Sequence, residues 1–329
     1  MDSFLFALGA VAPIVLMVVI GYFFKKIGLM DEGFAKMANK LVFRAFMPVM
    51  LFVKIYSISD LSGIDLGFIG YGAIAIVAVF ALSVPASIMV TKHKDRRGVL
   101  VQAAFRSGYS LIGIPLAGSL YGEEGAVAAT LLSTVAIPIF NILAVISLSA
   151  LGAEGGKKPS VKKILIDIIK NPLILGIAAA IAAIGVRTVL SEINISFRLS
   201  DIGPLFVVLE YLADLAIPLA LLVLGAQFEF SAVSSLKREI IFGTLVRTVI
   251  VPAITLGIAF AFFKDRFTPA HFATFVAAFA TPVAVPSVPM VQEMGGDVTL
   301  AGQLVVWSTL VSAITVFITT FLLRLGGAF

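Results

Sequence analysis

Apolar residues are gathered into ten long runs along this chain of 329 residues, with short polar segments between them. Each run has about the 20 residues that an α-helix needs to cross the hydrocarbon core of a bilayer. The runs lie at about 4–24, 35–55, 66–90, 98–121, 125–149, 171–189, 203–227, 239–263, 269–293 and 297–324. The first run follows no basic segment, so we expect a transmembrane helix there rather than a signal peptide. The pattern predicts an all-α polytopic membrane protein with ten transmembrane helices, called spans 1 to 10 in chain order.

The composition agrees with this class and excludes several kinds of chemistry. Hydrophobic residues make up 60% of the chain and charged residues 13%, whereas about a quarter of the residues are charged in a typical soluble domain. The chain has no cysteine, so it has neither disulfides nor thiolate chemistry. Its two histidines, His93 and His271, fall in loops at span ends and make no metal-ligand cluster. The sequence therefore predicts no metal site and no cofactor.

The basic residues are distributed unevenly between the segments that join the spans. With the N-terminus outside, the inside segments carry most of the bases and the outside segments carry more acids. The inside bases are Lys25, Lys26, Lys92, Lys94, Arg96, Arg97, Lys157, Lys158, Lys162, Lys163, Lys170, Lys237 and Arg238, and the main outside acids are Asp60, Asp65, Glu123, Glu124 and Glu192. Basic loops stay on the cytoplasmic side, so we expect both termini on the non-cytoplasmic side of the cell membrane. Membrane orientation, rather than nucleic acid, explains the net charge of +5.

The ten spans divide into two halves of five that share landmarks. The first half is 1–150, the second is 171–329, and a connector at 151–170 joins them. The stretches Ala103–Pro115 and Ala277–Pro289 both begin Ala-Ala-Phe and end in proline, at an offset of 174 residues. Because each half has an odd number of spans, we expect the two repeats to be inverted in topology. The second part of the connector has an apolar stripe with basic flanks, which fits a helix in the cytoplasmic interface or a charged tether.

The two matching stretches contain residues that interrupt helices. Proline removes a backbone donor and clashes with the carbonyl four residues before it. Unwound backbone at membrane depth is tolerated only where protein buries it or where it lines a wet cavity. The N–H groups set free suit anions, and the carbonyls set free suit cations. We therefore predict that spans 4 and 9 are broken at mid-membrane and form one binding site. The alternative is that the prolines only kink continuous helices.

The predicted site residues are the basic, hydroxyl-bearing and helix-breaking positions of these stretches. In span 4 they are Arg106, Ser107, Gly108, Tyr109, Ser110, Gly113 and Pro115. In span 9 they are Thr281, Pro282, Pro286, Ser287 and Pro289. The planar guanidinium of Arg106 is suited to binding a carboxylate with two parallel hydrogen bonds. It is equally suited to a structural role, bound to backbone carbonyls that the break sets free.

Further polar residues in the spans are candidates for coupling or counter-charge, because an ionisable group inside the bilayer is costly unless it is paired or hydrated. They are Glu210, Asp214, Arg247, Gln292 and Glu293. Glu210 and Asp214 share one face of span 7 and are candidate proton carriers. Alternatively, these two acids lie at the outer aqueous edge or pair with Arg44 or Arg247. Glu293 would either ligate a cation or face water at the inner end.

Four segments carry a recognisable pattern. They are Phe105–Gly125 and Thr281–Asp297, which contain the interrupted stretches, and Ala216–Ala226 and Leu245–Pro252 in spans 7 and 8. Together they resemble the auxin efflux carrier family over nearly the whole chain. This family includes plant auxin carriers and bacterial members linked to malate or malonate, and its architecture is similar to that of the bile acid:sodium symporters. One position departs from the family pattern, since Gly108 stands where the family usually has asparagine.

The resemblance implies how the spans are used. Spans 1, 2, 6 and 7 would form a scaffold. Spans 3–5 and 8–10 would form a moving transport domain, in which spans 4 and 9 cross at the site. The resemblance also implies export as the direction of transport and a homodimer assembled through the scaffold.

The expected function is secondary active transport of small organic anions, such as carboxylates, by alternating access and without catalysis. A proton gradient, a sodium gradient or the membrane potential could supply the energy. A sodium-coupled symporter of the bile-acid type is one alternative, although only Gln292, Glu293 and a few hydroxyls near the crossover offer oxygen ligands. A membrane sensor or an intramembrane enzyme is another, but the spans hold no nucleophile–base pair and no metal-ligand cluster.

Overall fold

The computed structural model describes residues 2–57, 65–152, 161–193 and 195–329. Within these ranges the regular secondary structure is helical, without a β-strand. Asp60 and the first part of the connector, with Lys157 and Lys158, lie outside the described residues. The helices in chain order are α1 (Asp2–Lys26), α2 (Glu32–Leu41), η1 (Val42–Phe46), α3 (Met47–Tyr56), α4 (Leu66–Val90), α5 (Lys94–Phe105), η2 (Tyr109–Gly113), α6 (Ile114–Leu151), α7 (Val161–Lys170), α8 (Pro172–Glu192), η3 (Leu199–Asp201), α9 (Gly203–Gln227), α10 (Ala232–Ser235), α11 (Lys237–Leu245), η4 (Val246–Ile250), α12 (Val251–Phe263), α13 (Pro269–Phe279), α14 (Ser287–Glu293) and α15 (Val298–Leu325).

Six helical segments of the described chain are long and apolar enough to cross a membrane, judged by length and composition. They are Leu66–Val90, Tyr109–Leu151, Pro172–Glu192, Gly203–Gln227, Lys237–Phe263 and Val298–Leu325. The segments predicted as spans 2, 4 and 9 are instead assembled from shorter helices: α2, η1 and α3 in the first case, α5 and η2–α6 in the second, α13 and α14 in the third. Spans 4 and 5 meet inside α6, where the chain turns at Tyr121 and Gly122.

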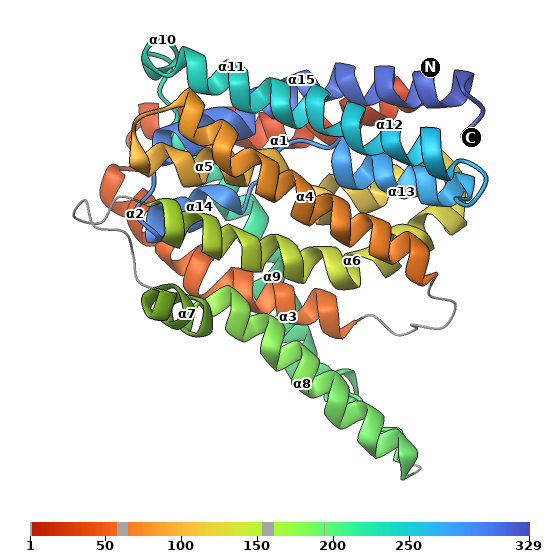
Figure 1. Cartoon of the computed structure of the whole chain (residues 1–329). Helices are drawn as coiled ribbons and strands as arrows, with labels where there is room; N and C mark the ends of the chain where they lie inside the picture. The colour runs from red at the N-terminus through yellow and green to blue at the C-terminus, as the bar shows by residue number, and fades with distance from the viewer. Residues whose placement is uncertain (1, 58–64, 153–160, 194) are drawn as a thin grey trace.

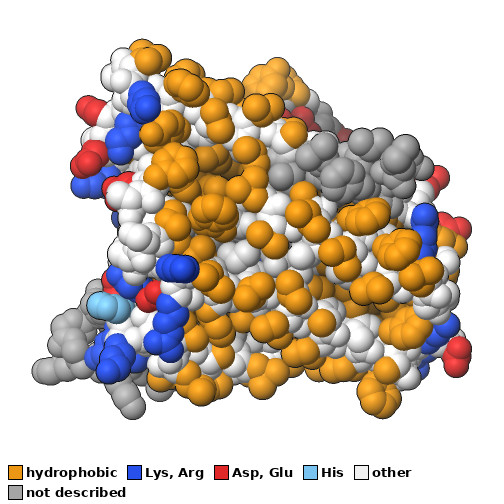
Figure 2. Space-filling model, turned by 90° about the horizontal axis from the view of Figure 1, so that it is seen from above, with side chains coloured by type: hydrophobic (Ala, Val, Ile, Leu, Met, Phe, Trp, Pro, Cys, Tyr) orange, Lys and Arg blue, Asp and Glu red, His pale blue; other side chains and the backbone are white. Residues whose placement is uncertain are grey.

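The helices run side by side between two ends of the molecule, and both termini lie at the same end (Figure 1). The short helices α2, α7, α10 and α14 lie toward the opposite end. Figure 2 shows a broad apolar surface whose Lys, Arg, Asp and Glu side chains gather at two edges. An apolar surface bounded by two charged edges is what a bilayer requires of a multi-pass membrane protein.

The second part of the connector is helical. It forms α7, which packs on α6 and α8 at the end opposite the termini. The connector is therefore more than an extended tether where the structure describes it.

Glycines let α1 pack on α9, and α3 on α8, backbone against backbone. A Cβ atom at Gly21 of α1 would overlap the carbonyl oxygen of Leu222, and one at Gly225 of α9 would overlap that of Val18. Gly176 of α8 approaches the backbone of α3 in the same way. Small residues at such crossings allow the close van der Waals packing that holds membrane helices together.

The other long helices form a second packed group around the two interrupted segments. In this group α13 packs on α6, α4 packs on α5 and α6, and α11 packs on α15. The two groups meet where α1 contacts α15 and α6. The predicted site therefore lies inside the second group, beside its contact with the first.

A π-helical turn stands directly before each of three prolines. The turn η1 precedes Pro48, η2 precedes Pro115 and η4 precedes Pro252. In an α-helix the proline ring collides with the carbonyl four residues before it, and the wider π turn relieves this collision. At Pro48 and Pro252 the helix continues through the proline with only this local widening.

The glycine contact between α1 and α9 yields a stability prediction. We expect Gly225→Ala to lower the free energy of unfolding by about 1–3 kcal/mol, because its methyl group would overlap the backbone of α1. The matched control is Gly257→Ala, because no atom lies within 4 Å of a Cβ at this position of α12. The control should change stability by less than about 0.5 kcal/mol. Thermal unfolding in detergent measures both, and equal effects would contradict the backbone contact.

Candidate functional site

The two interrupted segments cross where each has a short stretch of extended backbone. Helix α5 ends at Phe105 and α13 ends at Phe279, and neither resumes at once. The Gly108 N–H donates to the Pro282 oxygen at 2.7 Å, and the Ala284 N–H donates to the Arg106 oxygen at 3.1 Å. Ser107 and Val283 thereby form an antiparallel bridge. Both helices are broken here, so the alternative that the prolines only kink them is wrong.

The guanidinium group of Arg247 lies behind this crossing and is completely buried. Its Nε donates to the Thr281 oxygen at 2.8 Å. Its Nη1 donates to Ala104 and Phe105 at 3.0 and 3.4 Å, where α5 ends. Its Nη2 donates to the carbonyls of residues 278 and 279 at 3.0 and 2.8 Å, where α13 ends. One cation therefore binds the C-terminal carbonyls of both broken helices, where the helix dipoles are negative.

This arrangement reassigns two expectations from the sequence. A structural arginine bound to freed carbonyls was considered for Arg106, and the structure gives this role to Arg247 instead. Arg247 does not pair with Glu210 or Asp214, and Arg44 pairs with Glu293. The proposed pairing of Glu210 and Asp214 with either arginine is therefore not formed.

Arg106 is also buried, but it has fewer partners, and these are neutral. Its Nη2 donates to Asn141 Oδ1 at 2.8 Å and its Nη1 donates to Met290 Sδ at 3.2 Å. Among the described residues, no carboxylate oxygen lies within 4.0 Å of its guanidinium. The side chain is 4% exposed, and it lines a cavity at the crossover. Arg106 is thus a buried cation that faces an internal space without a counter-charge.

The crossover cavity is small, with a volume of about 50 Å³. Six of its lining residues were predicted from the sequence: Arg106, Ser107, Gly108, Tyr109, Ser110 and Pro286. The Tyr109 hydroxyl donates to the Ala129 oxygen at 2.7 Å, whereas the buried Ser107 Oγ has no hydrogen-bond partner among the described atoms. A volume of this size holds about one or two water molecules, so the cavity is too small for an organic anion in this conformation.

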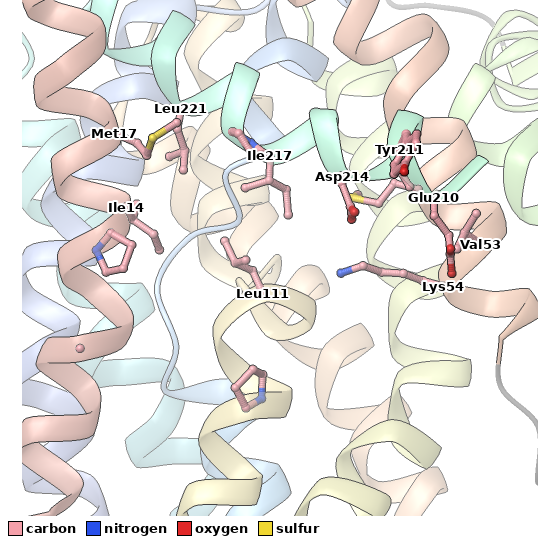
Figure 3. A pocket seen from close by; sticks show the side chains of 16 residues that line it. Ile14, Met17, Val53, Lys54, Leu111, Glu210, Tyr211, Asp214, Ile217 and Leu221 are labelled. Atoms are coloured by element: carbon pink, nitrogen blue, oxygen red, sulfur yellow. The ribbon is translucent and has the colours of Figure 1, made fainter. Parts of the chain in front are cut away.

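A much larger cavity of about 1120 Å³ lies beside it (Figure 3). The two cavities share four apolar lining residues: Ile14, Met50, Leu111 and Ile217. The larger cavity contains Pro115, Glu210 and Asp214 from the predicted set, together with Lys54 of α3. Figure 3 shows Lys54, Asp214 and Glu210 toward one side of this cavity and the side chains of α1 toward the other.

The remaining crossover residues support the backbone and line neither cavity. Thr281 Oγ1 donates to the Ala277 oxygen at 2.8 Å. The Pro282 carbonyl accepts from Gly108, as described above. Gly113 lies against Ala277, while Ser287 and Pro289 are buried in α14. In this conformation these positions shape the crossing, and their role in binding a ligand stays a prediction.

Gln292 and Glu293 lie at the end of the molecule away from the termini, outside both cavities. Asn39 Nδ2 donates to Gln292 Oε1 at 2.7 Å and to Gln227 Oε1 at 3.0 Å. Arg44 Nε donates to Glu293 Oε2 at 3.0 Å. Gln227 Nε2 also donates to Gln292 Oε1 at 3.2 Å. Together these contacts join α2, η1 and α9 to α14, and we call them the α14 contacts. Glu293 is engaged by an arginine, which leaves it poorly placed to ligate a cation at the crossover.

Lys54 and Asn141 are the two site residues whose importance the sequence reasoning missed. Lys54 is the one charged residue of the apolar helix α3 (Met47–Tyr56), and a charge at such a position marks a functional candidate. Asn141 of α6 accepts a hydrogen bond from the Arg106 side chain through its Oδ1 atom. The packing of α6 on α5 brings Asn141 and Arg106 together.

Comparison with known proteins bears on this arrangement. The family described as membrane transport protein matches residues 6–320. The chain belongs to this family. The resemblance to auxin efflux carriers seen in the sequence is thereby confirmed.

Two archaeal proteins align with most of the chain. One is an uncharacterized transporter of Methanothermobacter thermautotrophicus, 24% identical over 322 residues, which covers 93% of this chain and 94% of that protein. The other is an uncharacterized transporter of Methanocaldococcus jannaschii, 27% identical over 251 residues, which covers 73% of this chain and 75% of that protein. Membership of the family makes transport, rather than catalysis, the activity to explain.

The carbonyl contacts of Arg247 yield a second stability prediction. We expect Arg247→Lys to lower the free energy of unfolding by about 2–4 kcal/mol, because an ammonium has three donors and would leave buried carbonyls without partners. Arg238→Lys is the matched control, since this exposed arginine donates to a single carbonyl, that of Met89, at 3.3 Å. It should cost less than about 0.5 kcal/mol. Chemical or thermal unfolding in detergent distinguishes the two, and a neutral Arg247→Lys would refute the role given to this guanidinium.

Two glycines of span 4 differ in the space around them, which yields a third prediction. At Gly108, where the family usually has asparagine, a Cβ atom would lie 3.5 Å from the Pro282 oxygen, which is an ordinary contact. At Gly113 it would lie 2.7 Å from Tyr109 Cδ2 and 2.8 Å from the Ala277 oxygen. We expect Gly108→Ala to be tolerated within about 0.5 kcal/mol and Gly113→Ala to cost about 1–3 kcal/mol. Melting temperatures that reverse this order would show that the crossing is packed differently.

Proposed function

We propose that this protein is a secondary transporter of small organic anions that works by alternating access about the crossing of spans 4 and 9. The observation that carries the proposal is the position of Arg106. It is a buried cation with neutral partners, and it faces the crossover cavity. A buried charge without a counter-charge is costly, so its retention at this place favours an anionic ligand.

Two further features of the crossover cavity suit an anion. The segment η2–α6 begins at this cavity, and the N-terminus of a helix carries partial positive charge. Ser107 Oγ is a buried hydroxyl without a partner among the described atoms, and it can donate to a carboxylate oxygen. A carboxylate would therefore meet a guanidinium, a hydroxyl and a helix N-terminus in one place.

The packing supports an inverted repeat of ten spans. Under such a repeat, the contact of α1 with α9 corresponds to that of α8 with α3, and both contacts are made through glycines. Likewise the contact of α4 with α5 corresponds to that of α12 with α13. We take α1, α2–α3, α8 and α9 as the scaffold, and the other long helices as the moving transport domain.

The present conformation fits one end state of such a cycle. The α14 contacts join the scaffold helices α2 and α9 to α14 of the transport domain. At the other end, the large cavity separates the scaffold from Leu111 and Pro115. We infer a state that is closed on the inside and hollow toward the outside, with both termini outside the cytoplasm. The exposed apolar surfaces of α8 and α9 are candidates for a homodimer contact through the scaffold.

The proposal is tested by uptake into proteoliposomes that contain the purified protein. The solutes are acetate, malonate, malate, phenylacetate and indole-3-acetate, with neutral phenylacetamide and cationic phenethylamine for comparison. We expect at least one carboxylate to be transported, and neither comparison solute. Replacing sodium with choline should leave the uptake unchanged. Transport of only the neutral or cationic solutes would exclude an anion transporter.

Arg106 supplies the residue-level prediction. We expect Arg106→Met to abolish carboxylate uptake while leaving the melting temperature unchanged or higher, because exchanging an unpaired buried charge for an apolar side chain removes a desolvation cost. Arg106→Lys keeps the charge and should retain part of the activity. If Arg106→Met folds and transports normally, Arg106 is not a substrate-binding residue.

A further inference from the structure

The volumes of the two cavities determine where an organic anion can reside in this conformation. The crossover cavity has about 50 Å³ and the larger cavity about 1120 Å³, whereas sites for small organic ligands usually measure about 300–1,000 Å³. Of the two, only the larger cavity can therefore hold the ligand in this state. An anion would need a cation there, and Arg106 lines only the smaller cavity.

The larger cavity has a charged side and an apolar side (Figure 3). Lys54 of α3 faces Glu210 and Asp214 of α9 on the charged side. Ile14 and Met17 of α1 form the apolar side. Leu111 of η2 and aliphatic residues of α9 lie between the two sides. A ligand that fits both sides has an anionic head and an apolar body.

Lys54 is the cation of this cavity among its described lining residues. Its side chain is half-buried, and no carboxylate oxygen of the described residues lies within 4.0 Å of its Nζ atom. Figure 3 shows the Asp214 carboxyl group directed toward the ammonium group, and the two charges attract each other. The Lys54 ammonium group is therefore attracted by the Asp214 carboxylate but forms no direct ion pair with it.

We propose that Lys54 is the carboxylate-binding group of the larger cavity, and that an amphipathic carboxylate binds it together with one proton, which is taken up by Asp214. The argument is one of charge balance. Lys54, Glu210 and Asp214 carry a net charge of −1 when all three are ionised. An incoming carboxylate would raise this to −2 in a largely apolar space, and protonation of Asp214 restores −1 and frees Lys54 from its competitor. The inference rests on the proposed function and adds a second anion-binding residue and a coupling ion.

Among the described residues that line this cavity, four are titratable: Lys54, Glu210, Tyr211 and Asp214. Among the described lining residues, α1 and η2–α6 contribute no titratable side chain. Helix α9 contributes Tyr211 in addition to Glu210 and Asp214. From α8, Arg187 lies over the Tyr56 ring and donates to the Tyr56 oxygen at 3.4 Å, toward the outer end of α3. Near η3, Asp201 accepts from the Arg198 N–H at 2.7 Å. Asp214 is thus the acid set directly against Lys54, and Glu210, one turn earlier, is the acid to compare with it.

The test measures binding of phenylacetate to the purified full-length protein by isothermal titration calorimetry, with the neutral isostere phenylacetamide as the comparison ligand. We expect Lys54→Gln and Lys54→Met to weaken phenylacetate binding at least about tenfold and to leave phenylacetamide binding unchanged. Lys54→Arg keeps the charge and should stay within about threefold. The two neutral variants guard against a folding defect in one of them, and melting temperatures identify such a defect.

The proton is tested on the same ligand. We expect the wild-type affinity for phenylacetate to rise as the pH is lowered within the range above about 5.5, in which the ligand itself stays ionised. Asp214→Asn should bind at the higher pH with the affinity that the wild type reaches at the lower pH, and its binding should no longer depend on pH. Glu210→Gln is the matched control and should keep the dependence. Retained pH dependence in Asp214→Asn, or its loss in Glu210→Gln alone, would overturn the assignment to Asp214.

The outcomes separate this inference from the proposed function. Normal phenylacetate binding by folded Lys54→Gln or Lys54→Met, together with loss of uptake in Arg106→Met, would overturn the role of Lys54 and leave anion transport in place. Transport of malonate without any binding of phenylacetate at low millimolar concentration would likewise overturn the amphipathic site alone. If no carboxylate is bound or transported, both proposals are wrong.

Discussion

The crossing of the two broken helices depends on the guanidinium group of Arg247. Breaking two helices inside a membrane leaves two sets of C-terminal carbonyls without donors, and no water is present in the hydrocarbon core to replace them. Arg247 donates five hydrogen bonds to these carbonyls from a buried position behind the two crossing segments. The cost of burying its charge is offset by two helix dipoles whose negative ends meet at the same point. The fold can therefore keep an unwound segment at this depth.

The charge on Arg247 also explains why Arg106 is left for another task. Both arginines are buried, and they lie close to the same crossing. Because Arg247 already binds the freed carbonyls, Arg106 contacts only an amide oxygen, a thioether and a cavity. Two cations of the same chemical type are thus distinguished by their partners. Arg247 provides hydrogen bonds for the broken backbone, and Arg106 faces the crossover cavity.

The sequence predicted the breaks well because they are a local property. Proline and glycine act on the helix in which they stand, so Pro282, Pro286 and the Gly108–Pro115 segment mark the crossing without any tertiary information. The roles of the arginines depend instead on contacts over long sequence separations. Arg247 lies 143 positions from Ala104, to which it donates. Sequence patterns hold no record of such a contact, and the alternatives for Arg106 therefore stayed open. Lys54 differs, since it is the one charged residue between Ala45 and Tyr56 and is therefore visible in the sequence itself.

The two cavities impose a geometric condition on any alternating-access cycle. Of the four apolar residues that separate them, Ile14, Met50 and Ile217 belong to α1, α3 and α9, whereas Leu111 belongs to η2. The boundary between the cavities is therefore a contact between the two packed groups of helices. In the proposed cycle, a shift of η2 relative to the other three helices would open the crossover to the larger cavity without unfolding any helix. The α14 contacts with the helices α2 and α9 cross the same boundary at its other end. A rigid displacement of one group along the other would act on both places at once, so opening at one end can be linked to closure at the other.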